Sequence, residues 1–228
     1  MTMIEMYALY FGELLQEPVE GYLRYFSRTR QEEILRYRFL ADQNRTLWAE
    51  LLVRWAAAKR LSRKVEELPV ERDVNGKPYL RETGLHISIS HSKNWTAVSL
   101  GEEPSGIDVE EPCPGVADLA RNFFTASEYR RVSSISGEDG QTEEFLRMWT
   151  LKESYFKYTG DEECLQVDSK RISEDPRFNG RNVILPNRAV MGFCAGTAKE
   201  IEFYFAHWSG TVDFTVERQG GLEISRLT

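Results

Sequence analysis

A long stretch of helical periodicity dominates the first half of the chain. Its apolar residues recur three and four positions apart, and residues with that spacing share one face of an α-helix. Asp42 precedes the pattern and is a suitable N-cap residue. The sequence therefore predicts an amphipathic helix after Asp42 that anchors the first half. The apolar positions are Leu47, Trp48, Leu51, Leu52, Trp55 and Ala58.

Alternating polar and apolar residues predict strands in both halves. Side chains two positions apart point to the same face of a strand, and the segments 86–90, 97–100 and 106–110 follow this pattern. Four later segments have strand character and are expected to form an antiparallel sheet that closes the second half. They are residues 183–185, 189–194, 201–208 and 212–216.

The polar residues 102–105 interrupt the strands and mark a possible boundary between two halves. Helical patterns are predicted on both sides of it, at 31–40 before it and at 116–124, 127–135 and 145–158 after it. Residues 133–144 are polar with two glycines, which favours a mobile loop. Helices and strands are thus both abundant, as in a two-part α+β chain.

Composition excludes several classes of function. The chain has 228 residues and a net charge of −7, with no run of lysines and arginines, which argues against a general affinity for nucleic acid or for anionic membranes. No apolar stretch is long enough to span a bilayer. Cys113, Cys164 and Cys194 are odd in number and far apart, as expected of packed free thiols in the cytoplasm.

Two carboxylates share one face of the segment 106–110. Asp108 and Glu110 alternate with the apolar Ile107 and Val109, so their Cα atoms should lie roughly 7 Å apart on the same side of a strand. Like charges at that distance repel by about 2 kcal/mol at an effective dielectric constant near 20. A divalent cation would relieve this repulsion. Oxygen ligands without paired Cys or His favour Mg²⁺ or Mn²⁺ over zinc.

A third carboxylate and a lysine follow about forty residues later. Glu153 and Lys157 are four residues apart in a helical segment, so they share one face of that helix. Taken alone, such a pair is common on exposed helices. Combined with Asp108 and Glu110, and flanked by apolar residues, it predicts a groove lined by three carboxylates and one ammonium group.

Several residues of the first half are candidates for binding an anion, and each also has a structural interpretation. Ser90 and His91 lie at the end of a predicted strand and can donate to phosphate oxygens. The turn formed by Gly76, Lys77 and Pro78 can present an ammonium group, or be an ordinary solvated turn. Arg45 opens the long helix, whose positive end attracts anions, although a surface salt bridge with a residue such as Glu50 is the alternative.

These residues, in this order, resemble the 4′-phosphopantetheinyl transferase superfamily. The similarity extends over residues 36–160 and is closest to the Sfp-type, the longer monomeric type that activates nonribosomal peptide and polyketide synthetases. Its diagnostic pair is Gly-Ile-Asp-x-Glu followed by Trp-x-x-Lys-Glu-x-x-x-Lys. The matching segments are Asn44-Arg45-Thr46, Gly76-Lys77-Pro78-Tyr79, Ile89-Ser90-His91-Ser92, Gly106-Ile107-Asp108-Val109-Glu110, Phe123-Phe124 with Glu128-Tyr129, and Trp149 to Lys157.

The resemblance implies transfer of the phosphopantetheine arm of coenzyme A to a serine of an acyl or peptidyl carrier protein, giving holo-carrier and 3′,5′-ADP. By position, Asp108, Glu110 and Glu153 would hold Mg²⁺, with Mn²⁺ as a possible substitute. Asp108 would also contact coenzyme A. Either Glu153 or Lys157 would accept the serine proton, and Lys157 would also neutralise phosphate charge.

The same resemblance assigns the first-half residues to coenzyme A. Ser90 and His91 would contact its phosphates, with His91 counted among the catalytic residues. Arg45 and Lys77 would meet the 3′-phosphate and the adenosine end, and main-chain groups from Gly76 to Pro78 would read the adenine. Relatives carry lysines just before residue 36; this chain has Arg30 as a substitute and Glu33, whose charge opposes a phosphate contact.

The implied fold is α+β, with two similar halves related by a pseudo-twofold axis and coenzyme A in the cleft between them. The expected division is 1–104 for the nucleotide contacts and 105–228 for the metal ligands, the catalytic helix and the carrier. The carrier would dock beside the second half, near residues 113–124 and the loop before Phe145, with help from Arg121, Arg130 and Arg131. The protein is expected to be a cytoplasmic monomer.

Two other functions use the same residues. A Mg²⁺-dependent nucleotide pyrophosphatase or hydrolase would replace the serine by water and release 3′,5′-ADP without a carrier. A non-catalytic protein that binds carrier domains would keep the binding surface without turnover. The presence of Asp108, Glu110, Glu153 and Lys157 together argues against loss of activity.

Overall fold

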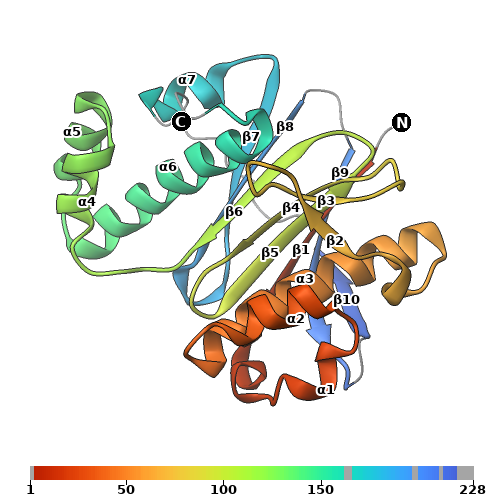
Figure 1. Cartoon of the computed structure of the whole chain (residues 1–228). Coiled ribbons are helices and arrows are strands. Elements are labelled where there is room, and N and C mark those ends of the chain that lie inside the picture. Colours follow the sequence, from red (N-terminus) through yellow and green to blue (C-terminus); the bar gives the residue numbers. More distant parts are fainter. Residues whose placement is uncertain (1–2, 162–165, 197–199, 211–212, 220–228) are drawn as a thin grey trace. The chain divides into compact units, whose positions relative to one another are not determined.

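The computed structural model describes residues 3–161, 166–196, 200–210 and 213–219 as helices, strands and connections (Figure 1). Its strands are β1 (Met3–Tyr10), β2 (Val70–Arg72), β3 (Pro78–Leu80), β4 (His86–His91), β5 (Trp95–Gly101), β6 (Ser105–Glu110), β7 (Phe178–Ile184), β8 (Val190–Gly196), β9 (Glu200–Trp208) and β10 (Phe214–Arg218). Its helices are α1 (Glu20–Leu23), α2 (Arg28–Leu35), α3 (Leu40–Leu61), α4 (Val116–Phe123), α5 (Ala126–Ser134), α6 (Glu138–Thr159) and α7 (Ser169–Glu174), with 3-10 turns η1 (Gly12–Gln16), η2 (Val65–Glu67) and η4 (Pro186–Arg188).

The chain divides into two compact units. The first contains Met1–Glu103 together with Glu200–Gln219, and the second contains Pro104–Lys199. The division after Glu103 falls within the predicted break at 102–105. The expected halves 1–104 and 105–228 differ from these units by one residue at the boundary and in the late strands β9 and β10, which belong to the first unit.

A five-stranded sheet forms the first unit, in the order β10-β9-β1-β5-β4. The central strand β1 runs antiparallel to β5, with Ala8 opposite Ala97, and parallel to β9, with Tyr7 opposite Tyr204. Strands β2 and β3 form a separate antiparallel pair. Parallel strands need a long crossover connection, and here the whole second unit lies in the chain between β1 and β9.

Helix α3 covers one face of this sheet. Its apolar stripe is buried, and Leu47, Leu51 and Leu52 are 0% exposed. The predicted helix is therefore confirmed, but its start is wrong. The helix begins at Leu40 after Phe39, which makes no capping hydrogen bond through its side chain. Asp42 lies inside the first turn, where its negative charge favours the helix N-terminus.

The second unit is built on a three-stranded antiparallel sheet in the order β6-β8-β7, with α6 packed against it (Figure 1). Two glycines allow this close packing. A Cβ atom added to Gly106 would lie 1.8 Å from the carbonyl oxygen of Ser154, and one added to Gly192 would lie 2.3 Å from that of Thr150. Helix and strand backbones therefore touch at positions that no larger residue can occupy without displacement.

The late strands are correctly predicted as strands but wrongly assigned to one sheet. β8 pairs with β6 and with β7 in the second unit, whereas β9 and β10 extend the sheet of the first unit, where β9 is parallel to β1. Alternation fixes the face that each residue presents and carries no information about which strand is its neighbour. Residue 212, the start of the last predicted strand, lies outside the described residues.

The expected mobile loop at 133–144 is mostly helical. Helix α5 extends to Ser134 and α6 begins at Glu138. Glu138 and Asp139 lie in the first turn of α6, where acidic side chains stabilise the positive end of a helix. Gln141 also donates to the carbonyl oxygen of Ile135 at 2.9 Å, which fixes the connection. At its other end, α6 stops as predicted at Gly160, whose φ is +73°.

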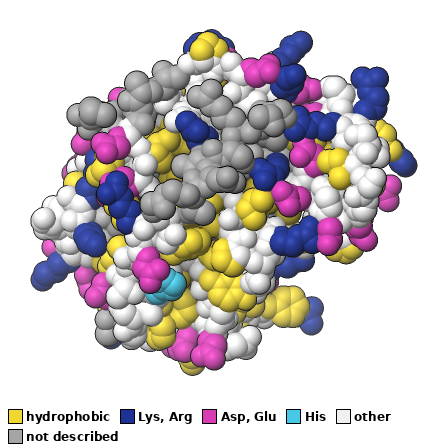
Figure 2. Space-filling model, turned by 180° about the vertical axis from the view of Figure 1, so that it is seen from behind, with side chains coloured by type: hydrophobic (Ala, Val, Ile, Leu, Met, Phe, Trp, Pro, Cys, Tyr) yellow, Lys and Arg dark blue, Asp and Glu magenta, His cyan; other side chains and the backbone are white. Residues whose placement is uncertain are grey.

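Two surface properties bear on function. Within the described ranges, no helix has both the length and the apolar character required to cross a membrane. Figure 2 shows acidic and basic side chains interspersed over the face it presents, apart from the residues drawn in grey. Of the cysteines, Cys194 is buried and Cys113 half-buried, both as free thiols, while Cys164 lies outside the described residues.

Candidate functional site

Asp108 and Lys157 form an ion pair between strand and helix in the second unit. The Nζ atom of Lys157 donates to Oδ1 of Asp108 at 2.6 Å. Gly106 faces α6, and Asp108 lies two residues further along β6, so its carboxylate points to the same side. Asp108 is only 3% exposed. A charge-assisted hydrogen bond of this length at a buried carboxylate fixes both side chains.

Glu153 lies one helical turn before Lys157 on α6. Burial raises the pKa of its carboxyl group, and the negative charge of Asp108 raises it further, while Lys157 lowers it. The electrostatic coupling shows that Asp108, Glu153 and Lys157 are neighbours, as the sequence predicted. A carboxyl group with a raised pKa in such surroundings is a candidate for proton transfer or for binding a cation.

Glu110 is the last residue of β6 and is half-buried. It shares the α6-facing side of the strand with Asp108, two residues before it. Among the described residues, however, no three His, Cys, Asp or Glu side chains are gathered in a group that could hold a metal ion. The predicted triad of Asp108, Glu110 and Glu153 is thus placed on adjoining elements without forming a chelating cluster.

The donor set nevertheless fits a hard cation. All three candidate side chains offer oxygen atoms, and the repulsion between Asp108 and Glu153 that raises the pKa of Glu153 is the kind that a divalent cation relieves. In this structure, the ammonium group of Lys157 supplies the positive charge beside Asp108.

A second, fully buried ion pair, which was not predicted from the sequence, lies in the same unit. Lys152 Nζ donates to Oε2 of Glu128 at 2.9 Å, and the two side chains are 1% and 2% exposed. Lys152 immediately precedes Glu153 in the helix, so it points to a different face. The signal in the sequence was a lysine on the apolar side of a helix, where an acidic partner is required.

Glu128 connects three helices through its hydrogen bonds. Besides Lys152 of α6, it accepts from the backbone N–H of Ser169 at the start of α7 at 2.8 Å, and it forms a capping box with Thr125 at the start of α5. Burial alone would raise the pKa of Glu128, but the hydrogen bonds from Lys152, Ser169 and Thr125 outweigh it and lower the pKa. The pair therefore holds α6, and with it Glu153, against its neighbours.

In the first unit, Arg45 connects the start of α3 to the turn between β4 and β5. Its Nε atom donates to the carbonyl oxygen of Lys93 at 2.7 Å, and its Nη1 atom pairs with Asp42. The alternative partner considered from sequence, Glu50, is not its partner among the described residues. This contact brings Arg45 to the turn that follows His91.

Arg30 occupies a different environment from the one predicted. Its guanidinium group contacts Glu50 at 2.8 Å and Glu33 at 2.7 Å, and its side chain is 16% exposed. Burial raises the pKa of Glu50, and Arg30 opposes that effect. Because Glu50 is itself buried, Arg30 compensates its charge, and this role weighs against direct contact with a phosphate.

The turn containing Gly76, Lys77 and Pro78 is held by Asp73. The side chain of Asp73 accepts from the backbone N–H of Lys77 at 2.9 Å, and its backbone pairs with Lys77 and with Gly76, whose φ is +81°. Arg72 donates to the carbonyl oxygen of Gly76 at 3.0 Å. The main-chain groups expected to read adenine are therefore engaged within the turn, while the side chain of Lys77 is exposed.

Ser90 and His91 end the edge strand β4. Ser90 pairs with Ala97 and His91 with Thr96 of β5, and the hydroxyl group of Thr96 donates to the carbonyl oxygen of Ser90 at 2.8 Å. Ser90 is buried and His91 exposed. Arg45 and His91 thus meet the same β4–β5 connection, as a binding site for an anionic group requires.

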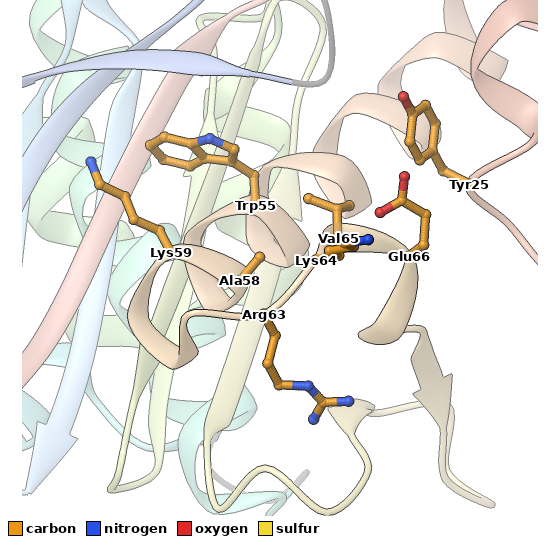
Figure 3. Close-up of a pocket in the computed structure, with 8 residues that line it drawn as sticks. All are labelled: Tyr25, Trp55, Ala58, Lys59, Arg63, Lys64, Val65 and Glu66. Atoms are coloured by element: carbon orange, nitrogen blue, oxygen red, sulfur yellow. The ribbon is translucent and has the colours of Figure 1, made fainter.

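The pocket drawn in Figure 3, of about 380 Å³, contains none of the predicted site residues. Its positive side chains do not converge: Lys59 Nζ lies 5.1 Å from the centre of the Trp55 ring, and Arg63 donates to the carbonyl oxygen of Glu67 at 3.0 Å. We therefore leave it out of the candidate site. It is lined by Tyr25, Trp55, Ala58, Lys59, Arg63, Lys64, Val65 and Glu66.

Comparisons with known proteins match both parts of the chain. Residues 104–210 match the family model of the 4′-phosphopantetheinyl transferase superfamily, and residues 16–102 match that of the 4′-phosphopantetheinyl transferase N-terminal region. The matched ranges meet at the break between the two units.

Individual proteins similar to this chain are also described as 4′-phosphopantetheinyl transferases. A 4′-phosphopantetheinyl transferase of Bacillus subtilis is 34% identical over 65% of this chain and 67% of its own length. The transferase psf-1 of Bacillus pumilus is 36% identical over 61% of each chain. The transferase Sfp of Bacillus subtilis strain 168 is 29% identical over 73% of this chain and 75% of its own. The chain therefore belongs to the 4′-phosphopantetheinyl transferase superfamily.

Proposed function

We propose that this chain transfers the 4′-phosphopantetheine moiety of coenzyme A to a serine of an acyl or peptidyl carrier protein through the residues described above. The observation that supports this assignment most directly is the Lys157–Asp108 ion pair with Glu153 beside it, inside the region that matches the superfamily model. In the reaction, a bond forms between the serine oxygen and the phosphorus atom that bears pantetheine. The bond from that phosphorus to 3′,5′-ADP breaks, and the ADP keeps the electron pair.

In this proposal, Asp108, Glu110 and Glu153 would hold Mg²⁺, with Mn²⁺ as a substitute. When bound, the cation supplies charge neutralisation at the diphosphate of coenzyme A. Lys157 supplies a second positive charge from the protein itself, at a position fixed by Asp108. A fixed cation at the place where negative charge develops lowers the barrier without reorganisation.

The sequence left the proton acceptor open between Glu153 and Lys157, and the geometry favours Glu153. Lys157 donates to Asp108 and acts as a positive charge. Glu153 is the other candidate, and burial of its carboxyl group raises its pKa, which favours proton acceptance. We therefore assign to Glu153 the acceptance of the serine proton, directly or through a water molecule.

We assign the nucleotide end of coenzyme A to the first unit. Arg45 and His91 adjoin the β4–β5 connection, with Ser90 beside them, and would contact phosphate oxygens. Lys77 offers an exposed ammonium group on a turn that Asp73 keeps rigid, and would meet the 3′-phosphate. Gly76 and Pro78 contribute by shaping that turn. Arg30 is left as a weaker candidate because Glu33 and Glu50 hold it.

The carrier is proposed to dock on the second unit beside α4. Phe123 is 53% exposed and packs against Trp149 with ring centres 5.7 Å apart, which gives an apolar surface at the end of α4. Arg121 lies on the same helix and is exposed, and its ion pair with Asp118 is long, at 3.7 Å. Arg131 pairs with Glu144, so it is less suited to a carrier contact than the sequence suggested.

Mass spectrometry of an apo-carrier incubated with coenzyme A, Mg²⁺ and this protein tests the proposal. We expect the carrier to gain the mass of one phosphopantetheine, and only when all components are present. Release of 3′,5′-ADP in the absence of carrier would instead identify a hydrolase. Binding of the carrier without any gain in mass would identify a non-catalytic binding protein.

A further inference from the structure

Six consecutive residues, from the last residue of α2 to the first residue of α3, form an exposed surface that the proposed reaction does not use. We name residues 35–40, Leu-Arg-Tyr-Arg-Phe-Leu, the 35–40 surface. Four of its side chains are large and apolar, and concentrated exposure of this kind marks an interaction site rather than ordinary surface. The exposed fractions are 47% for Leu35, 46% for Tyr37, 61% for Phe39 and 39% for Leu40.

The backbone presents these side chains in a fixed conformation. The side chain of Gln43 donates to the carbonyl oxygen of Tyr37 at 2.9 Å. The backbone N–H of Asp42 donates to the carbonyl oxygen of Phe39 at 3.0 Å. Ile34, directly before the surface, is 0% exposed and anchors it in the core. The apolar side chains are therefore exposed by an ordered turn, so a partner can bind them without ordering the chain first.

The local charge of the surface is positive. Arg36 and Arg38 are both exposed, and neither forms an ion pair within the part of the chain that the structure describes. The start of α3 adds the positive end of a helix whose N-cap, Phe39, provides no capping side chain. The nearby carboxylates already have partners, in the pairs Glu32–Arg28, Glu33–Arg30 and Asp42–Arg45.

We propose that the 35–40 surface binds an acidic protein segment with apolar side chains, and that this segment belongs to the carrier protein. The inference rests on the proposed function, which supplies a protein substrate. A chain with a net charge of −7 does not attract an acidic partner overall, so attraction must come from local positive regions such as Arg36 and Arg38. The surface belongs to the first unit and is proposed independently of the contact beside α4.

Two other occupants fit less well. Basic residues add about 1 kcal/mol each to binding of an anionic membrane, so two arginines on a chain of charge −7 give a weak membrane anchor. A second copy of the chain, bound through the same surface across a twofold axis, would bring Arg36 and Arg38 of both copies together. Of these occupants, only an acidic segment with apolar side chains complements both the arginine charges and the apolar side chains of the 35–40 surface.

The test compares a charge-reversed enzyme, Arg36→Glu with Arg38→Glu, with a control that carries the same change in charge elsewhere. Lys64→Glu with Lys170→Glu serves as the control, because both lysines are exposed and neither belongs to the proposed site. We expect the KM for apo-carrier to rise at least tenfold over the control, while the KM for coenzyme A stays within twofold. Phe39→Ser should raise the KM for the carrier severalfold, and this KM should still depend on salt concentration. In the charge-reversed enzyme, the KM for the carrier should no longer depend on salt concentration.

Binding measurements keep this test independent of turnover. Titration calorimetry of apo-carrier should show at least tenfold weaker binding to the reversed enzyme, whether or not the wild-type protein transfers phosphopantetheine. A carrier affinity equal to that of the control would overturn the proposal. The proposal would also be overturned if the wild-type protein were a dimer that Phe39→Ser converts to a monomer. It would be overturned as well if the wild-type and control proteins bound phosphatidylglycerol vesicles and the charge-reversed enzyme did not.

Discussion

Lys157 Nζ and Asp108 Oδ1 lie 2.6 Å apart although 49 residues separate them in the chain. The contact depends on the close packing of α6 against β6 at Gly106, where the two backbones touch. A lysine at the end of a helix is thereby brought to a buried carboxylate in the middle of a strand. The relationship links the packing of the second unit directly to its chemistry.

Lys157→Ala should lower kcat for phosphopantetheine transfer by about 10²-fold to 10³-fold, because it removes a fixed positive charge from the reacting phosphate. Steady-state kinetics with saturating coenzyme A and carrier would measure this. Lys170→Ala, which removes an exposed lysine paired with Glu174 at 3.7 Å, should leave kcat unchanged. Equal rates for the two variants would contradict the assignment of Lys157.

Asp108→Ala and Glu153→Ala should each abolish Mg²⁺-dependent transfer while the protein stays folded, because each removes a ligand rather than core volume. Transfer assays over a range of Mg²⁺ concentrations, combined with circular dichroism, would show this. Glu174→Ala is the control, since Glu174 lies on the exposed side of α7. A near-normal rate in either test variant at ordinary Mg²⁺ concentrations would disprove the metal assignment.

Lys77→Ala should raise the KM for coenzyme A about tenfold with little change in kcat. The loss of one phosphate contact of this kind corresponds to about 1.4 kcal/mol. The turn itself should persist, because Asp73 holds the backbone rather than the side chain of residue 77. Dephospho-coenzyme A provides the control, since it lacks the 3′-phosphate and should be bound equally by both proteins. An unchanged KM for coenzyme A would remove Lys77 from the site.

Gly106→Ala should destabilise the second unit by about 3 kcal/mol or more, because the new Cβ atom would lie 1.8 Å from the carbonyl oxygen of Ser154. Thermal denaturation would measure the loss. Gly21→Ala is a matched control, since a Cβ atom at Gly21 meets nothing within 4 Å. If both variants melted at the wild-type temperature, the close approach of α6 to β6 would be wrong.

The buried pair Glu128–Lys152 predicts a dependence of stability on pH. The pKa of Glu128 is lower in the folded protein than its ordinary value of 4.5. A carboxyl group with a lowered pKa stabilises the fold above its unfolded pKa, and this contribution is lost as the pH falls through the folded pKa. The stability advantage of the wild type over Glu128→Gln should therefore be constant above about pH 5.5 and shrink below pH 4.5.

Urea denaturation at pH 7, 5 and 3.5 would test this dependence. Lys152→Ala should be severely destabilised at neutral pH, by about 3–5 kcal/mol, because it leaves a buried charge without a partner. A difference between wild type and Glu128→Gln that stays the same at pH 3.5 would show that ionisation of Glu128 does not contribute.

Local sequence patterns predicted most of the helices and strands, including the strand and the helix that carry the candidate site residues. The stripe of α3, the strand β6 and the end of α6 at Gly160 were all predicted, because periodicity and a glycine stop signal are local. Resemblance of the motifs identified the superfamily, which the comparisons confirmed. The α+β class with two transferase parts was confirmed in the same way.

Partners distant in sequence were not predictable from the pattern. Lys157 was expected to lie beside Glu153 on the helix, which it does, but its hydrogen bond to Asp108 was not predicted. The hydrogen bond of Arg30 to Glu50, twenty residues away, was likewise not predicted. Strand β9 was assigned to the wrong sheet for the same reason. In each case the decisive contact depends on tertiary packing, which residue spacing does not encode.

The parallel pairing of β9 with β1 has a consequence for biosynthesis. Strand β1 is central in its sheet, yet one of its neighbours is made only after nearly two hundred further residues. A ribosome-bound chain ending before Glu200 would therefore expose an unsatisfied row of peptide groups along β1, a surface prone to aggregation. Since the segment Pro104–Lys199 has already been made by then, it can fold before β9 is available to complete the sheet of the first unit.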